Sequence, residues 1–351
     1  MHLRTKIRTL GTAAAMMFVV GCSSGSALAP NPSTPRQHAH FLLGRIPVAL
    51  DPMSILRVNL NSGHHFKSFN ACPITGSLTY ISDFNNSVIN IYAGTFANQA
   101  PCGILTGLTN PQGMFVAGNH DLYVANTGAN NILVFARHAA TPKNTYTDPG
   151  IQYPTDVTVA TDGTVIASNI FQPNGNEAGS ISTWIGGPNG GTFVGNFPMV
   201  KDFEGLFVTV QRNGTLYFND LDATTAQGII WTGSCPSGAC GAFTSTGATA
   251  GFSGGLRSAD HEDLVQVDQT IPAGGGLITY ESFPAGTSCA IGGGRPAALD
   301  LDRPQSHAYY SDITLNLGGE IAYPSCTAVG TVPGNPNGLP IGIAHDKPEP
   351  L

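Results

Sequence analysis

Six short runs of β-prone residues, each ending in Asp or Asn, recur along the chain at a nearly constant distance. The runs cover residues 78–83, 122–126, 165–169, 216–220, 264–268 and 308–312. Their last residues are 43, 43, 51, 48 and 44 positions apart. Self-similarity at a fixed period predicts a repeat architecture, in which each unit buries its apolar face against its neighbours.

A polar turn and a second apolar run, which ends in an aromatic residue, follow each of these runs. The second runs cover residues 89–92, 132–135, 181–184, 229–231, 277–280 and 321–323. Two β-prone runs around a turn predict a hairpin. The terminal Asp or Asn is expected to hydrogen-bond the turn backbone. The aromatic residues are expected to pack between neighbouring sheets and not to form a ligand site.

A third apolar run precedes five of the hairpins. These runs cover residues 111–116, 154–159, 203–208, 254–259 and 295–300, and a sixth, 337–343, stands at the C-terminal end with no hairpin after it. The first hairpin lacks such a run before it. Both irregularities disappear if the chain closes into a ring, which removes exposed sheet edges. We therefore predict an all-β, six-bladed β-propeller in which residues 337–346 pair with the first hairpin, beginning near Leu78.

One stretch, residues 110–136, carries a family resemblance. Its sequence, NPQGMFVAGNHDLYVANTGANNILVFA, resembles the NHL unit, with Pro-x-Gly, an apolar strand, a turn, and then LYVAN and NILVF. The pattern from about residue 75 to 346 is similar to NHL-repeat and TolB-like six-bladed propellers, although the fourth and fifth units carry insertions. This resemblance implies the fold and leaves the function open.

The N-terminal segment has the features of an export signal. Arg4, Lys6 and Arg8 precede an apolar run, 10–20, which is too short to span a bilayer. The end of this run, Val-Val-Gly-Cys22, resembles a bacterial lipobox, whose Cys is acylated. We expect a signal peptide at 1–21, a lipid-bearing Cys22 with a flexible tether to residue 45, and the propeller at 46–351. An ordinary signal peptide cleaved near 27–29 is the alternative.

Ser23 follows the cysteine, and this resembles lipoproteins sorted to the outer membrane. The expected location is therefore the outer membrane or cell surface, or the periplasm or exterior if Cys22 is not lipidated. Residues 41–70 fit none of the repeats.

Composition and charge exclude several kinds of partner. Only 11% of residues are charged, while 44 Gly and 25 Pro suit a chain of short strands and turns. Without the signal, 12 of the 15 Lys and Arg residues remain against 22 acidic residues, and no basic cluster occurs. A nucleic-acid partner is therefore not expected, and contact with a membrane is expected only through the lipid. We expect a monomer.

The cysteines agree with export, because assigning Cys22 to the lipid leaves six, an even number that can pair as disulfides. Six cysteines allow 15 pairings, so the count alone does not give the connectivity. Positions within the repeats favour three pairs: Cys235 with Cys240, Cys289 with Cys326, and Cys72 with Cys102. Their spacings match no zinc pattern.

Candidate ligands lie where the third runs begin, because these runs are expected to surround one mouth of the channel. Alignment gives one residue per unit: Gln112, Thr155, Glu204, Gly254, Pro296 and Asn337. Glu204-Gly205 and Asn337-Gly338 resemble metal-binding motifs of the SMP-30/gluconolactonase propellers, although Leu206 replaces the usual Pro. The resemblance implies Ca²⁺ on Glu204 and Asn337, with Asp156 as a base. Calcium takes six or more oxygen ligands, several of them charged, whereas only one residue of this column carries a carboxylate. The alternative is therefore a polar rim that holds no cofactor.

Other candidates for catalysis are weaker. Ser253 lies in a Gly-x-Ser-x-Gly pattern, but a nucleophile elbow needs a helix after the turn, and none is expected here. The histidines have no metal-ligand spacing. We therefore predict no catalytic residue, and a non-catalytic binding or scaffold protein for an envelope protein, peptide or polysaccharide. The alternative is a metal-dependent lactonase or related hydrolase, and a quinoprotein-like oxidoreductase ranks last because no basic cofactor cradle is visible.

Overall fold

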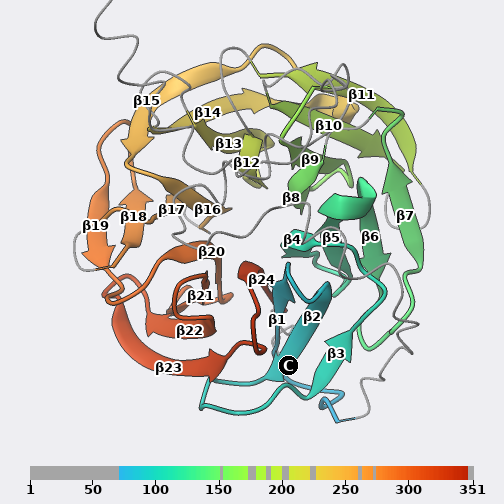
Figure 1. Cartoon of the computed structure of the whole chain (residues 1–351). Coiled ribbons are helices and arrows are strands. Elements are labelled where there is room, and N and C mark those ends of the chain that lie inside the picture. Colours follow the sequence, from blue (N-terminus) through green and yellow to red (C-terminus); the bar gives the residue numbers. More distant parts are fainter. Residues whose placement is uncertain are drawn as a thin grey trace, which may run out of the picture. The chain divides into compact units, whose positions relative to one another are not determined.

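The described part of the chain forms six four-stranded antiparallel sheets arranged as blades around one axis (Figure 1). The computed structural model describes residues 71–150, 153–172, 179–186, 191–199, 205–221, 227–259, 263–271 and 274–346. The six-bladed β-propeller predicted from the repeats is confirmed. Cys22, the tether, residues 41–70 and Glu204 lie outside the described residues.

Each blade runs from an inner strand at the axis to an outer strand, and we name the blades A to F in ring order. The inner strands are β24 (Pro340–Asp346), β4 (Pro111–Val116), β8 (Pro154–Val159), β12 (Gly205–Val210), β16 (Ser253–Ser258) and β20 (Pro296–Leu301). The second strands are β1 (Leu78–Asp83), β5 (Leu122–Asn126), β9 (Val165–Asn169), β13 (Thr215–Leu221), β17 (Leu264–Asp268) and β21 (His307–Asp312).

The third strands are β2 (Val88–Ala93), β6 (Asn131–Phe135), β10 (Ser180–Ile185), β14 (Gly228–Ser234), β18 (Gly276–Tyr280) and β22 (Leu317–Ala322). The outer strands are β3 (Gly103–Leu105), β7 (Asn144–Thr147), β11 (Thr192–Pro198), β15 (Thr244–Ala250), β19 (Thr287–Ala290) and β23 (Thr327–Pro333). Two short 3-10 helices, η2 (Thr127–Ala129) and η4 (Pro236–Gly238), lie in loops. The outer strands escaped the hydrophobic pattern for two reasons: β3, β7 and β19 have only three or four residues, and the seven-residue strands β11, β15 and β23 are largely exposed.

The ring closes as predicted, because the C-terminal strand β24 supplies the inner strand of blade A. Leu78 of β1 pairs with Asp346 of β24, and the antiparallel register continues through Tyr80 opposite Ala344. Strand order in this blade is β24-β1-β2-β3. Blade A is therefore built from two segments far apart in the sequence, and its hydrogen bonds hold the ring shut.

Three of the recurring Asp residues, Asp83, Asp268 and Asp312, bind amides of the following turn, as the sequence predicted. Asp268 accepts hydrogen bonds from the Thr270 amide at 2.8 Å and from the Gly251 amide at 2.9 Å. Asp83 likewise binds the amides of Asn86 in the following turn and Leu339 ahead of the inner strand. The second of these roles was not predicted. The carboxylates of Asp83 and Asp268 thus each tie their own turn to the loop that leads into the inner strand of the same blade.

Residues just before this Asp/Asn position form a second set of polar contacts. All six pairings between inner and second strand change register near the start of the inner strand, which marks a β-bulge. In three blades a side chain there accepts a bond from an inner-strand amide: Ser82 from Gly342, Asn219 from Phe207, and Ser311 from Ala298. Asn219 and Ser311 also donate to the inner strand of the next blade, at Gly254 and Ile341. These side chains replace ladder bonds that the bulges interrupt.

Aromatic residues at the ends of third strands join three of the blades to the blade before them. Tyr92 donates to the Pro333 carbonyl of blade F, and Trp184 donates to the Thr147 carbonyl of blade B. Tyr280 reaches the Thr249 carbonyl of blade D at 3.5 Å. The aromatic rings are buried between sheets, so the prediction that they serve packing is confirmed for these positions.

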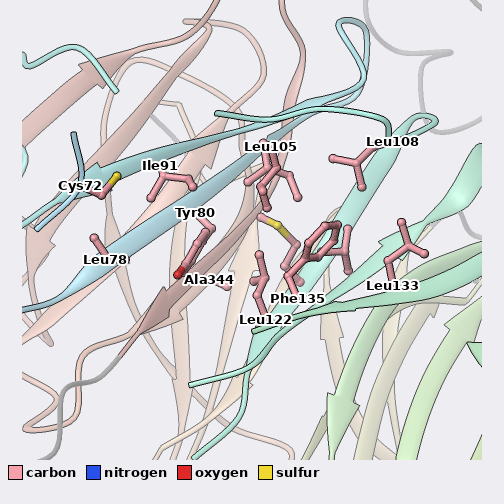
Figure 2. Packing of buried hydrophobic residues seen from close by; sticks show 13 residues of the cluster. Cys72, Leu78, Tyr80, Ile91, Leu105, Leu108, Leu122, Leu133, Phe135 and Ala344 are labelled. Atoms are coloured by element: carbon pink, nitrogen blue, oxygen red, sulfur yellow. The ribbon is translucent and has the colours of Figure 1, made fainter. Parts of the chain in front are cut away.

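Hydrophobic cores fill the spaces between neighbouring blades. Figure 2 shows one between blades A and B, where Tyr80, Ile91 and Leu105 pack with Leu122 and Phe135. All five side chains are almost fully buried. The alternating pattern of each strand therefore places apolar residues against both adjacent sheets.

Three disulfides join the cysteine pairs that the repeat positions favoured: Cys72–Cys102, Cys235–Cys240 and Cys289–Cys326. The last bond links blade E to blade F. Closing a loop of 30 or 37 residues is worth about 3–4 kcal/mol in the chain-entropy model. Structural disulfides of this kind indicate an oxidising environment outside the cytosol.

Substitution of Asp268 tests the role of the Asp/Asn position. Asp268→Ala leaves the amides of Gly251, Phe252 and Thr270 without their acceptor, so we expect the free energy of unfolding to fall by about 2–4 kcal/mol. Asp268→Asn keeps one acceptor oxygen and should retain most of the stability. Urea unfolding measures both, and equal losses in the two variants would contradict the assignment.

Candidate functional site

The residues predicted to line the channel mouth occupy different settings in the structure. Gln112, Thr155 and Gly254 are the second residues of their inner strands, and Pro296 is the first residue of β20. Asn337 is exposed and lies three residues before β24, in a turn, so the aligned run 337–343 begins ahead of the strand. The φ of +57° places Asn337 in the left-handed region, so the extended strand cannot begin at this residue.

The turn around Asn337 is held by asparagine side chains of the two blades that it joins. Asn85 of blade A donates to the Asn337 carbonyl, and Asn86 donates to the Pro336 carbonyl. Asn316 of blade F donates to the Asn335 carbonyl at 2.7 Å. Three consecutive backbone carbonyls are thus bound on the way into the ring-closing strand. This turn contributes its backbone to the architecture and presents the side chain of Asn337 to solvent.

Arg257 of β16 occupies the axis of the propeller. Its Nη1 donates to Asp156 Oδ2 of β8 at 2.9 Å, and its Nη2 donates to the Met114 carbonyl of β4 at 2.7 Å. Strands β16 and β4 lie on opposite sides of the ring (Figure 1). The guanidinium therefore crosses the channel, where its side chain is only 5% exposed.

The contacts of Arg257 extend to every inner strand. Asp156 also accepts a bond from the Val208 amide of β12 at 3.2 Å. Asp300 of β20 lies 3.9 Å from Arg257 Nε and accepts a bond from the His345 amide of β24 at 2.8 Å. Inner strands present unpaired backbone groups to the axis, and these charged side chains bind them. We call Asp156, Arg257 and Asp300 the axial network.

Burial sets the electrostatics of the axial network. Complete burial raises the pKa of Asp156 above its ordinary value, and the charge and hydrogen bonds of Arg257 oppose that rise. Burial alone would lower the pKa of Arg257, but Asp156 and Asp300 raise it, so the guanidinium stays charged. A buried charge pair of this kind is costly to break, because either partner alone remains desolvated.

Close approach of two inner strands is required for Asp156 to reach Arg257. A Cβ atom on Gly113 would lie 2.1 Å from Asp156 Oδ1 and 2.7 Å from its Cα. Any side chain at Gly113 would therefore displace Asp156. The glycine beside the predicted Gln112 has a packing role that the sequence pattern did not reveal.

The chemistry left to the predicted site is restricted. Asp156 is bound by Arg257 and is not a free base. Within the part of the chain that the structure describes, no group of three or more His, Cys, Asp or Glu residues is placed to hold a metal ion. Glu204, the first proposed ligand, lies outside that part. Ser253 is buried in β16 and accepts a bond from Gln266 at 2.7 Å, so its surroundings are those of a strand and not of a nucleophile elbow.

Arg257 and Asp300 were missed by the sequence interpretation. The available signal was a charged residue inside an apolar run, Arg in SGGLRS and Asp in PAALDL. Charged residues are rarely buried unless they are paired. The partner of each cannot be read from one sequence, because Arg257 and Asp156 are 101 residues apart.

Comparisons with known proteins show the fold. No model of a known protein family and no curated protein matches the sequence. A chain in the crystal structure of a nidogen/laminin complex aligns with a TM-score of 0.56 and 13% identity, over 77% of this chain and 98% of that chain. Streptogramin B lyase aligns at 0.52 with 15% identity, over 82% and 89% of the two chains.

A functionally unknown protein from Desulfotomaculum acetoxidans aligns at 0.51 with 11% identity, over 78% of this chain and all of that one. Together with the six sheets, these similarities define the protein as a six-bladed β-propeller, the fold implied by its likeness to NHL-repeat and TolB-like proteins. At such identities they carry no information on activity. No helix among the described residues has the length and apolar character needed to cross a membrane.

Substitution of Gly113 tests the axial network. Gly113→Ala forces Asp156 away from Arg257, so we expect the free energy of unfolding to fall by about 3 kcal/mol or more. Gly118→Ala is the matched control, because Gly118 is exposed and a Cβ there meets nothing within 4 Å. Denaturant unfolding of the two variants should differ sharply. Equal stability would show that the axis tolerates displacement of Asp156.

Proposed function

We propose that this protein is an exported, lipid-anchored propeller that binds an envelope partner and does not catalyse a reaction. The axial network is the observation that carries this proposal. Arg257 fills the axis and joins all six inner strands, so the described inner-strand charges serve the architecture. The partner would therefore be bound by side chains on the rims of the propeller, where the loops differ from blade to blade.

Export is supported by three disulfides in the described residues and by the N-terminal signal. Anchoring through Cys22 is supported by the lipobox-like sequence before it. A tether and a lipid would hold the propeller near a membrane while its faces stay accessible. A protein, peptide or polysaccharide of the envelope is the partner class that fits this placement.

Exposed side chains at the mouth support binding there. Leu315, in the turn between β21 and β22, is 48% exposed, and Pro336 and Asn337 are exposed beside it in the loop before β24. The Asn316 hydrogen bond to the Asn335 carbonyl holds these two segments together. An apolar residue next to polar groups on a fixed backbone suits recognition of an amphipathic partner.

Cys22→Ser tests the anchor. Without the thiol no thioether to the lipid can form, so we expect the protein to move from the membrane fraction to the soluble exported fraction. Metabolic labelling with a radioactive fatty acid should mark the wild type and not the variant. Labelling of the variant, or an unchanged membrane fraction, would contradict anchoring through Cys22.

Photo-crosslinking in cells tests the binding role. A benzophenone amino acid at position 315 or 337 should give an adduct of discrete mass, because both positions lie at the proposed surface. The matched control is position 329, where Val is 43% exposed on the outer strand β23 of the same sheet as Leu315's turn. We expect no adduct from that position.

The lactonase alternative defines the contradicting result. If positions 315 and 337 give no adduct, and purified protein hydrolyses a sugar lactone with calcium but loses this activity in Glu204→Gln, the enzyme interpretation replaces the binding one. A rise in melting temperature with calcium that Glu204→Gln abolishes would support the same conclusion.

A further inference from the structure

Ile74 lies on the surface of blade A with its side chain in solvent. It is 84% exposed, more than any other large hydrophobic residue in the described part of the chain. Single exposed apolar residues are common on protein surfaces, but the segment around Ile74 is held from both sides. The Cys72–Cys102 disulfide fixes its start. Arg137 of blade B donates to the Gly76 carbonyl near its end. The backbone therefore keeps this apolar side chain at one place on the surface.

The segment around Ile74 leads into β1, on the face of the ring at which the inner strands end. Leu78, the first residue of β1, pairs with Asp346, the last residue of β24. We call this face, which carries Ile74 and Asp346, the anchor face. Leu315 follows the C-terminal end of β21, another second strand, and so lies at the opposite face beside the loop before β24. The proposed binding surface at Leu315 and Asn337 is therefore on the other side of the ring from Ile74.

The charges beside Ile74 are compatible with an anionic neighbour. Asp346 is fully buried and binds Arg137. Asp121 is also buried and binds Lys143 at 2.5 Å. The two cationic side chains stay partly exposed, at 16% for Arg137 and 30% for Lys143. Where blades A and B meet, the described part of the anchor face thus combines an apolar side chain with two cations whose carboxylate partners are buried. This combination suits an anionic lipid surface.

The sequence that precedes this segment has the same sign of charge. Between Cys22 and residue 71 there are four Lys or Arg residues and one acidic residue, whereas residues 71–351 have eight against 21. Basic residues close to a lipid anchor are attracted to anionic lipid headgroups. The basic stretch therefore complements the membrane surface, and it joins the propeller at the anchor face.

We propose that the anchor face lies against the anionic surface of the membrane that holds the lipid, with the side chain of Ile74 inserted among the headgroups. This inference rests on the proposed anchor at Cys22 and goes beyond the contact through the lipid alone that composition led us to expect. One isoleucine binds a bilayer weakly, but the anchor makes this second contact intramolecular, so a weak contact is sufficient. The surface at Leu315 and Asn337 then points away from the membrane, where a partner can reach it.

Tryptophan fluorescence measures the insertion of position 74. Ile74→Trp and the matched control Leu315→Trp are made in the lipidated protein, which is reconstituted in vesicles of phosphatidylcholine and phosphatidylglycerol with brominated acyl chains. Relative to vesicles without bromine, we expect about a twofold loss of the added emission for Ile74→Trp and no loss for Leu315→Trp. The wild type, which has Trp184 and Trp231, supplies the background. Both substituted positions are exposed, so folding should be unaffected.

Photo-crosslinking in cells identifies the neighbour of each face. A benzophenone amino acid at position 74 should give an adduct whose added mass is that of a phospholipid, because the side chain lies among headgroups. The same amino acid at position 315 should give no phospholipid adduct, since that position is on the opposite face.

The contradicting results separate this orientation from the anchor itself. If fatty-acid labelling marks Cys22, but position 74 shows neither quenching nor a phospholipid adduct, the orientation is overturned and the anchor stands. A protein adduct at position 74 in place of lipid, or equal quenching at positions 74 and 315, would also overturn it. If no fatty acid is found on Cys22, the proposed anchor fails and the orientation fails with it.

Discussion

One guanidinium, that of Arg257, sits where six sheets would otherwise leave unpaired backbone at the axis. Its bonds to Asp156 and to the Met114 carbonyl span the channel, and Asp156 and Asp300 extend the contact to the remaining inner strands. Such a group is stable at the centre only when its partners stay in place, because a buried charge without a partner is strongly unfavourable. The position of each blade at the axis is therefore coupled to that of the others, and Gly113 keeps the space that this coupling needs.

Much of this architecture could be predicted from the sequence, because repetition supplies evidence that one unit alone lacks. The spacing of the Asp and Asn positions gave the number of blades, and the unpaired run at the C-terminal end gave the closure through β24. The cysteine pairs followed from their places in the repeat. The outer strands were missed because they are either only three or four residues long or largely exposed.

The candidate site was less predictable, since it depends on residues that do not repeat. Arg257, Asp156 and Asp300 are not repeated from one unit to the next. They meet only because the ring brings distant strands together. Alignment of the repeats placed Asn337 in the same column as Gln112, but the left-handed turn sets it apart from the strand. Asp156 was identified as a residue of the axis, although its binding by Arg257 gives it a structural role that the sequence could not show.

The aromatic residues at the blade edges have a further consequence for assembly. Tyr92, Trp184 and Tyr280 each bind the outer strand of the preceding blade, and never the following one in these three cases. The contact between blades is thus heterologous, with a donor side and an acceptor side, and repeated contacts of this type form a ring only when the rotation per step closes. The angle between neighbouring blades therefore limits the number of blades in the ring. A seventh blade, added by duplication, would fit only if the angle at every junction became smaller.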